Sequence, residues 1–450
     1  MDQNLRAAVQ HAMDHEDRRL PKRNLARMPR LVAAALFSLS FVPAFVWAQI
    51  DPLASAKTLR PEALVDAVLQ DNPLLPAAQW AWQAAESEIV PAGALDDPML
   101  STMVAPRTFG KAEMDPGVGI ELSQRLPWPG KRGLREEIAR FEARAIKQSI
   151  PNTRLDLTEL AKAAFADWYL VHAALQVNEA NRKLWQDVRE IAAINYASGT
   201  GSQQDVLQAN VEYQMLGHRQ VVLERQRAEV LAQLNRLLNR TAAAPLPPPA
   251  SLADPRDLQS LVDLRALALA QRTELEAAEA EIEADSARVD LAKREFYPDF
   301  QLSTGYNSMW DDSDMQWTVG VGINIPLGHA KRHAAVSGAR AEAMESRWRL
   351  QDLSLEIVKE VEQAYARVQE AYHLLGLHED QLLPLARANL EVARTAYQAR
   401  TGSLESLLRA ERSLFETELN FEAARADYYR NMAALERAVG GWSQPMEAAR

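Results

Sequence analysis

The chain has 450 residues, none of them cysteine, and a formal net charge of −11 at pH 7. The lack of cysteine excludes disulfides, thiolate metal sites, cysteine nucleophiles and a lipid-modified N-terminal cysteine. The acidic balance excludes a nucleic-acid partner, because the phosphate backbone would repel such a surface. Long stretches rich in Ala, Leu, Glu, Arg and Gln are typical of long helices and coiled coils.

Residues 1–48 are predicted to be a signal peptide. Six Lys and Arg residues between Arg18 and Arg30 precede the apolar run from Leu31 to Trp47, and Ala48 ends an acceptable cleavage site. The alternative is an uncleaved membrane helix, and Met13 or Met28 could be the true start. No later apolar run is long enough for a membrane-spanning helix, so a mature chain that crosses a membrane must do so with strands.

A first repeat is expected over 49–244. Its elements, in chain order, are a helix over 59–94 bent at Pro73 and Pro76, a strand pair within 98–126, a long helix over 131–196 broken at Pro151, a turn at 197–202 and a return helix over 203–240. The strand prediction is clearest over 117–126, where apolar residues alternate with small and polar ones in period two.

A second repeat is expected over 258–440, after a Pro-rich linker at 245–257 and before a C-terminal tail at 441–450. Its elements are a helix over 258–295, a strand pair within 298–326, a long helix over 331–399 kinked at Pro384, a turn at 400–403 and a return helix over 404–438. The apolar residues of the long helix are spaced by alternating threes and fours, as in a coiled-coil seam.

Matching motifs about 200 residues apart show that the chain is duplicated. Tyr196-Ala-Ser-Gly-Thr-Gly-Ser202 returns as Tyr397-Gln-Ala-Arg-Thr-Gly-Ser403, and Val118-Gly-Ile120 returns as Val321-Gly-Ile323. Leu100-Ser-Thr102 and Lys131-Arg132 also recur in the same order. A duplication on this scale determines the architecture: each copy supplies a helix, two strands and a long helical hairpin.

The strands are predicted to cross a membrane. They are about ten residues long, which suits a tilted transmembrane strand, and Tyr306, Trp310 and Trp317 lie near the connecting loop, where an aromatic girdle belongs. An ordinary hairpin on a soluble core is the alternative. Four strands cannot close a barrel, so the chain must oligomerise. Two copies would give eight strands and a lumen filled by side chains, whereas three copies would give a twelve-stranded channel.

The long helices cannot form a globular core and are expected to extend the barrel as a coiled-coil tunnel, with the two turns at its far end. No P-loop, HExxH, GxSxG or strand-linked GxGxxG motif is present, so neither an enzyme nor a cofactor is predicted. The sequence favours a passive conduit. The alternatives from other classes are a periplasmic adaptor (membrane fusion) protein, a structural coiled-coil protein of the envelope and a periplasmic enzyme.

Residues 60–438 resemble the outer-membrane factor family, the TolC-like exit ducts of tripartite efflux systems. Asn72-Pro-Leu-Leu75 resembles the family's N-terminal repeat, and Val118-Gly-Ile-Glu-Leu-Ser-Gln124 with Pro127-Trp-Pro-Gly-Lys-Arg132 resembles its strand-to-helix corner, particularly in heavy-metal efflux members. Tyr196, Gly199, Ser202 and Asp205-Val-Leu207 match the family's periplasmic tip. The second tip departs from that pattern at Arg400 and Ser406.

The resemblance implies a mainly α fold with a β-barrel part: a homotrimer whose twelve-stranded barrel spans the outer membrane of a Gram-negative bacterium and continues as a periplasmic helical tunnel. It implies as partners outer-membrane lipid, a periplasmic adaptor and an inner-membrane pump of the resistance–nodulation–division type. The tips that would contact the adaptor are Gly199, Thr200, Gly201, Ser202, Arg400, Thr401, Gly402 and Ser403. The periplasmic entrance or gate would involve Tyr196, Asp205, Tyr397 and Glu405.

Several of these residues have plainer explanations. The two tyrosines could simply pack helix ends, and the glycines could serve the turns. His329 and His333, four residues apart, could share a metal but have no third ligand nearby. The loop residues Met309, Asp311, Asp312, Asp314 and Met315 could contact passing cations or form an ordinary acidic loop. The corner motif favours heavy-metal cations as cargo, with drug or small-molecule efflux and type I secretion as alternatives.

Overall fold

The computed structural model describes residues 57–106, 117–310 and 312–441. The chain divides into two units, Met1–Gln49 and Ile50–Arg450. The predicted signal peptide and nearly all of the C-terminal tail lie outside the described residues, so the following concerns the second unit. Within the described residues, no helix combines the length and the apolar character needed to cross a membrane.

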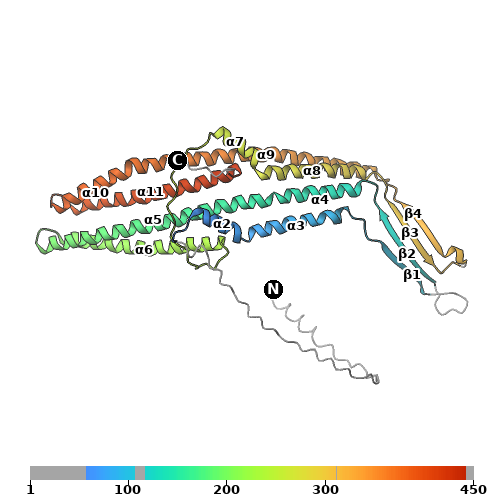
Figure 1. Ribbon diagram of the computed structural model, residues 1–450, viewed down its shortest axis with the longest axis horizontal. Coiled ribbons are helices and arrows are strands. Elements are labelled where there is room, and N and C mark those ends of the chain that lie inside the picture. The colour runs from blue at the N-terminus through green and yellow to red at the C-terminus, as the bar shows by residue number, and fades with distance from the viewer. Residues whose placement is uncertain (1–56, 107–116, 311, 442–450) are drawn as a thin grey trace, which may run out of the picture. The chain divides into compact units, whose positions relative to one another are not determined.

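Each repeat contains the same succession of elements (Figure 1). The first consists of α2 (Pro61–Asp71), α3 (Leu74–Gly93), β1 (Met99–Ala105), β2 (Gly117–Leu126), α4 (Lys131–Lys147), α5 (Ser149–Ala197) and α6 (Gln203–Leu237). The second consists of α7 (Leu261–Gln271), α8 (Thr273–Arg294), β3 (Phe300–Asn307), the short 3₁₀ helix η2 (Ser313–Met315), β4 (Trp317–Ile323), α9 (His329–Gly376), the π-helical turn η3 (Leu377–Leu382), α10 (Leu383–Gln398) and α11 (Leu404–Val439). The predicted class, mainly α with a sheet, is confirmed.

Two predicted helices are each divided in two. The helix expected over 59–94 ends at Asp71, because Asn72 is extended and its amide Nδ2 donates to Leu237 O at 2.9 Å. The helix expected over 258–295 is interrupted at Arg272, which is extended and donates from its guanidinium to Ala438 O at 3.0 Å. Pro73 marks the first break in the sequence. The second break depends on a contact 166 residues away.

The two long helices also differ from the prediction. The break expected at Pro151 falls earlier, between Lys147 and Ser149, so that the proline lies in the first turn of α5, where a missing N–H costs little. In the second repeat the backbone forms the π-helical turn η3 before Pro384, which lies at the start of α10. A π turn is a recognised means of accommodating a disruption within a long helix.

The four strands form one antiparallel sheet in the order β1-β2-β3-β4. The central pair, β2 with β3, joins the two repeats: Gly119 lies opposite Asn307, and Leu126 lies opposite Phe300. Strands β1 and β4 are the edges. Because the strands alternate in direction, these two edges run antiparallel to each other, and in the described part of the chain each has a strand partner on one side only.

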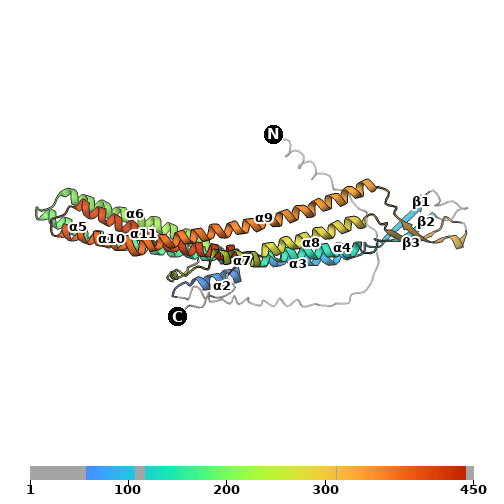
Figure 2. The same cartoon turned by 90° about the horizontal axis from the view of Figure 1, so that it is seen from above.

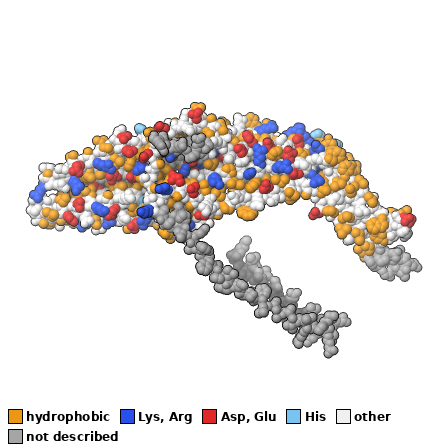
Figure 3. All heavy atoms as spheres, in the orientation of Figure 1, with side chains coloured by type: hydrophobic (Ala, Val, Ile, Leu, Met, Phe, Trp, Pro, Cys, Tyr) orange, Lys and Arg blue, Asp and Glu red, His pale blue; other side chains and the backbone are white. Residues whose placement is uncertain are grey.

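The two faces of the sheet differ in chemistry. One face carries large apolar side chains that are mostly exposed, and Figure 3 shows hydrophobic atoms gathered over this end of the unit. These residues include Leu100, Val104, Ile120, Leu122, Leu302, Trp317, Val319, Val321 and Ile323. The other face is mainly small and polar, with Ser101, Gly119, Glu121, Ser123, Gln301, Ser303, Gly305, Thr318, Gly320 and Gly322. An apolar outer band with a polar inner face is the pattern of a membrane barrel wall.

The helices continue the order of the strands. Next to the sheet, neighbouring helices pack in the order α3-α4-α8-α9, and nearer the tips in the order α6-α5-α11-α10. Figures 1 and 2 place the sheet at one end of the unit and the two helical turns at the other. Between these ends lie two equivalent cores, one around α2 and α5 and the other around α7 and α9. The chain thus forms three successive layers: the sheet, the helices next to it and the helices nearer the tips. Each layer has two edge elements.

The junction of sheet and helices contains a buried ion pair. Gly130 takes a left-handed conformation (φ 92°) that turns the chain into α4, so that Lys131 points inward. The Lys131 ammonium contacts Asp299 at 2.9 Å, Glu295 at 3.2 Å and the Tyr297 carbonyl at 3.1 Å. The corner of the first repeat is therefore fastened to the start of β3 in the second.

Candidate functional site at the two helical tips

The first tip, residues 198–202, connects α5 to α6 through a tight turn. Gly199 has φ +73°, a left-handed conformation that glycine adopts without steric cost. The amides of Thr200 and Gly201 both donate to Asn195 O at 2.9 Å, which closes the end of α5. A Cβ atom on Gly201 would lie 2.9 Å from Asn195 Cβ. Both glycines are thus required by the backbone.

The second tip, residues 399–403, has the same turn between α10 and α11. The amides of Thr401 and Gly402 donate to Ala396 O at 2.9 and 3.0 Å. At the position of Gly199 this tip has Arg400, with φ +61°. A side chain in this region costs roughly 1–2 kcal/mol. The two tips therefore share a shape, while the second presents a cationic side chain held in a strained backbone.

Both return helices begin with a serine N-cap. Ser202 Oγ accepts from Asp205 N at 3.1 Å, and Ser403 Oγ accepts from Ser406 N at 3.2 Å. Capping of this kind stabilises a helix start by about 1 kcal/mol. The two predicted tip serines thus define where α6 and α11 begin, and both are exposed.

An apolar cluster behind the tips joins the two hairpins. It draws on α5, α6, α10 and α11 and includes Trp185, Val188, Ala192, Ala209, Leu216, Tyr397, Leu404, Leu407, Leu408 and Phe415. Since neither hairpin could bury these residues alone, the cluster fixes the position of one tip against the other.

Repeat-related residues differ sharply in exposure at this end. Tyr397 is 6% exposed, whereas its counterpart Tyr196 is 50% exposed. Leu408 is 4% exposed, whereas Leu207, at the same place in the first return helix, is 59% exposed. The second hairpin is thus covered by the first, while the equivalent surface of the first hairpin is uncovered within one chain.

Of the four predicted entrance residues, the structure brings two together. Burial raises the pKa of Tyr397, and the nearby carboxylate of Asp205 raises it further, while a hydrogen bond to Asn195 acts in the opposite direction. Tyr397 therefore stays neutral beside the half-buried Asp205. Glu405 does not join them: it is exposed and pairs with Arg409 at 2.6 Å.

One buried acidic residue is absent from the sequence prediction. Glu411 lies in α11, is 5% exposed, and contacts Trp185 and Asn181 of α5. The signal was present in the spacing, because Leu404, Leu408, Glu411 and Phe415 follow steps of four, three and four along one helix face. A glutamate in the place of an apolar seam residue indicates a specific polar contact.

The suggested metal-binding residues lie apart from the tips. The rings of His329 and His333 face Phe296, with centroids 6.4 and 5.1 Å from it. In the acidic loop, Asp312 accepts from Asp314 N, and Asp311 lies outside the described residues. Over the part of the chain that the structure describes, no three His, Asp or Glu side chains converge as metal ligands would.

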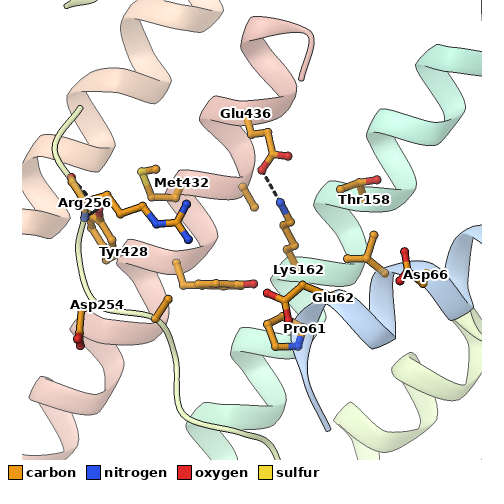
Figure 4. Close-up of a pocket in the computed structure, with 14 residues that line it drawn as sticks. Pro61, Glu62, Asp66, Thr158, Lys162, Asp254, Arg256, Tyr428, Met432 and Glu436 are labelled. Atoms are coloured by element: carbon orange, nitrogen blue, oxygen red, sulfur yellow. Dashed lines mark hydrogen bonds and ion pairs between the residues drawn. The ribbon is translucent and has the colours of Figure 1, made fainter. Parts of the chain in front are cut away.

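A cavity of about 500 Å³ lies between α2, α5, α11 and the linker (Figure 4). Its wall includes the ion pair of Lys162 with Glu436 and the backbone of Arg256, whose N–H donates to the Tyr428 hydroxyl at 3.0 Å. Burial raises the pKa of Tyr429, which also lines the cavity, so its hydroxyl stays neutral. These side chains join the linker to the helices and contain no pairing of nucleophile and base.

The family model described as "Outer membrane efflux protein" matches residues 64–240 and 264–441. The pyoverdine export outer membrane protein OpmQ of Pseudomonas putida is 24% identical over 404 residues, which is 86% of this chain and 83% of OpmQ. The cation efflux system protein CusC of Escherichia coli is 28% identical over 190 residues, 39% of this chain and 40% of CusC.

Solved structures share the fold. A crystal structure of CusC superposes with a TM-score of 0.72 at 20% identity, covering 85% of this chain and 92% of CusC. The outer membrane protein VceC of Vibrio cholerae gives a TM-score of 0.71 at 19% identity, covering 85% of this chain and 97% of VceC.

Proposed function

The chain belongs to the outer membrane efflux protein family and is an outer membrane efflux channel; from this premise we propose that three copies close into a passive duct that docks on a periplasmic adaptor and exports heavy-metal cations. The duct performs no chemistry. An inner-membrane pump, of the resistance–nodulation–division type, selects and drives the cargo.

Unsatisfied sheet edges support closure by further copies. Among the described residues, the outer sides of β1 and β4 have no strand partner, and in lipid each unpaired backbone group costs several kcal/mol. The antiparallel relation of these edges lets β4 of one copy pair with β1 of the next. Three copies of four strands give twelve, the smallest number above eight that whole copies of this chain can supply.

The observation that carries the proposal is the unequal exposure of repeat-related residues. Within the chain, the order α6-α5-α11-α10 places an outgoing helix of the first hairpin against the return helix of the second. Repeating this contact around a ring would place α10 of one copy against α6 of the next. That contact covers Leu207, as Leu408 is already covered, and burying a leucine contributes roughly 1.5–3 kcal/mol.

The same reasoning applies in the layer next to the sheet. The edge helices are α3 and α9, and both expose large apolar side chains: Trp80 and Val90 on α3, and Trp348 and Leu355 on α9. Each of the three layers therefore ends in two edge elements whose repeat-related counterparts pack against each other inside the chain. A ring of three copies satisfies all of these edges at once.

Docking on the adaptor is proposed for the two tips. Their turn residues, Ser198–Thr200 and Ala399–Thr401, are exposed at the end of the unit farthest from the sheet. In a trimer, three tips carrying Gly199 would alternate with three carrying Arg400. An adaptor would then meet two kinds of site of similar shape, one neutral and one cationic.

Heavy-metal cations are the proposed cargo because the Pro127–Arg132 corner resembles that of metal-efflux members and because CusC, a cation efflux protein, is a relative. The inner face of the sheet suits hydrated ions, since it carries small polar side chains together with the carboxylate of Glu121. Export of organic small molecules is the second candidate. It is favoured by OpmQ, a pyoverdine export protein whose alignment covers more of this chain than that of CusC.

Closure is tested by the native mass of the mature chain extracted in detergent, with the detergent contribution subtracted. A mass of three chains is expected. A monomer, or a chain that stays in solution without detergent, would contradict the shared barrel.

Cargo is tested by deleting the gene and exposing the cells to copper, zinc, cobalt and hydrophobic drugs. Loss of tolerance to one or more metals, restored by the intact gene, is expected. Unchanged metal tolerance together with increased drug sensitivity would reject metals in favour of organic cargo.

A further inference from the structure

Two polar oxygens lie buried without a partner at the contact between the hairpins. Among the described residues, neither Oε1 of Glu411 nor Oδ1 of Asn181 has a hydrogen-bond partner. Both side chains are more than nine-tenths buried, with exposed fractions of 5% and 9%. An unsatisfied buried acceptor costs roughly 1–3 kcal/mol, and more if it is charged. The arrangement is thus poor for an ionised carboxylate.

The surroundings of Glu411 favour its neutral form. Burial is the largest influence and raises the pKa of Glu411, and the carboxylate of Glu212 on α6 acts in the same direction. Hydrogen bonds from Trp185 and Asn181, and the charge of Arg412, lower the pKa but do not offset burial. The net effect is a pKa above the ordinary 4.5.

Other charged groups near Glu411 line two adjoining cavities. They are His218 and Arg219 on α6, and Glu416 and Glu418 on α11. Glu418 also pairs with Arg387 of α10 at 3.7 Å. Arg219 lies over the Phe415 ring, 4.4 Å from its centroid, and Arg412 pairs with Glu212. Arg387 and Arg412 thus pair with other carboxylates and Arg219 lies over a ring, so none of these three arginines forms an ion pair with Glu411 among the described residues.

Glu411 also lies where the two helical hairpins meet. It belongs to α11 of the second repeat and contacts α5 of the first, in the cluster that fixes one tip against the other. The larger adjoining cavity, of about 670 Å³, reaches Glu411 from between α6 and α11. Water can thus reach the carboxylate if the helices separate slightly.

We propose that Glu411 is a proton-operated catch: while protonated it holds α5 and α11 together behind the tips, and on losing its proton it releases them. A proton on Oε1 provides an O–H that can donate to Asn181 Oδ1, so one proton gives both unsatisfied oxygens a partner. An ionised Glu411 instead requires solvation. Water from the adjoining cavity supplies it when the contact between α5 and α11 loosens. Resting on the proposed duct function, the catch would make the periplasmic entrance tighter in acid and looser towards neutral pH.

The direction of the pH effect follows from the difference between the pKa of Glu411 in the closed and open states. Because the folded state raises the pKa of Glu411, protonation stabilises the contact between α5 and α11. This stabilisation is fully present below the ordinary pKa of 4.5 and is lost as pH rises through the raised pKa. Between 4.5 and the raised pKa, each pH unit multiplies the ratio of open to closed contacts between α5 and α11 by up to about ten, and above the raised pKa this ratio no longer changes.

The test is amide hydrogen exchange of the full mature protein in detergent, at pH 5 to 8, with each rate divided by the intrinsic chemical rate. Amides in 181–192 and 407–415 should lose protection in the wild type, by up to about tenfold per pH unit, until the pH passes the raised pKa of Glu411, and should then level off. Glu411→Gln keeps a neutral donor at this place and should stay protected throughout. Glu416→Gln, an exposed site on the same helix, is the matched control and should behave as the wild type.

Planar-bilayer conductance over the same pH range supplies an independent readout. Conductance should rise with pH in the wild type and stay at its acid level in Glu411→Gln. Equal pH dependence of exchange in the wild type and Glu411→Gln would overturn the catch. If amide exchange depends on pH through Glu411 but conductance does not depend on pH, Glu411 does not control the passage of ions. No conductance in any variant would count against the channel function itself, while exchange would still decide the catch.

Discussion

Lys131 and Asp299 form a buried ion pair 2.9 Å long between positions 168 residues apart in the chain. Their side chains are only 1% and 6% exposed. Asp299 also accepts from Trp128 N at 3.0 Å and from Arg125 at 3.0 Å. The pair fastens the corner that follows β2 to the residue that precedes β3, so the two repeats are joined where the barrel wall meets the helices.

Replacing Lys131 with methionine should therefore destabilise the folded protein by about 3 kcal/mol, because it removes the buried cation and leaves Asp299 with only the largely exposed Arg125 as its charged partner. The temperature at which the detergent-solubilised protein unfolds reports this loss. Arg140→Met, which removes an exposed pair with Glu136 one turn apart, is the control and should cost less than about 1 kcal/mol. Equal effects of the two substitutions would show that the junction pair has no special role.

The backbone of Arg400 predicts a stabilising substitution. Arg400→Gly relieves the left-handed strain and should stabilise the second tip by about 1 kcal/mol, seen as roughly fivefold slower exchange of the Thr401 and Gly402 amides. Arg400→Ala removes the charge but keeps a Cβ atom, so it should leave exchange nearly unchanged. Slower exchange in both variants would attribute the effect to charge.

The electrostatic effect of Asp205 on the buried Tyr397 makes Asp205 the stronger candidate for an entrance gate. Asp205→Ala should raise single-channel conductance or weaken block by divalent cations in planar bilayers, because three carboxylates would be lost from the entrance. Glu405→Ala is the matched control, since Glu405 is exposed and already paired with Arg409. If Asp205→Ala changes neither quantity, Asp205 is not a gate. A larger effect of Glu405→Ala would transfer the role to that residue.

The internal repeat predicts a specific contact between copies. Within one chain Tyr397 lies near Asp205, so the repeat-related pair, Tyr196 and Ser406, should meet between neighbouring copies of a trimer. Cysteines at Tyr196 and Ser406 should therefore give covalent trimers after oxidation, visible on a non-reducing denaturing gel. Cysteines at Tyr397 and Asp205 should close within one chain and leave a monomer band. Monomers in both cases would argue against the ring arrangement.

Much of the fold could be predicted from periodicity. Alternation over 117–126 predicted a strand where β2 extends from Gly117 to Leu126, and the repeated Tyr-to-Ser motifs predicted turns where the two tips occur. These signals are local, because side-chain spacing and turn chemistry are set by neighbours in the chain. The break at Arg272 was missed since it depends on Ala438 O and Glu360, which only the tertiary structure brings close.

The candidate site was less predictable than the fold. Tyr196 and Tyr397 occupy the same place in the motif, yet one is exposed and the other buried. No sequence pattern distinguishes them, because the difference arises from which side of each hairpin meets a neighbour. Glu411 was overlooked for a related reason: its role depends on Asn181 and Trp185, which lie on another helix.

The pairing of β2 with β3 has a consequence for how the protein is made. Val118 N donates to the Ser308 hydroxyl across 190 residues of chain, so the first pair of strands must wait for the rest of the first repeat and the start of the second before its inner edge is covered. Contacts this distant form slowly. During export the leading half would present an open apolar sheet to the periplasm, and safe biogenesis calls for a chaperone that holds extended strands until the trailing half arrives.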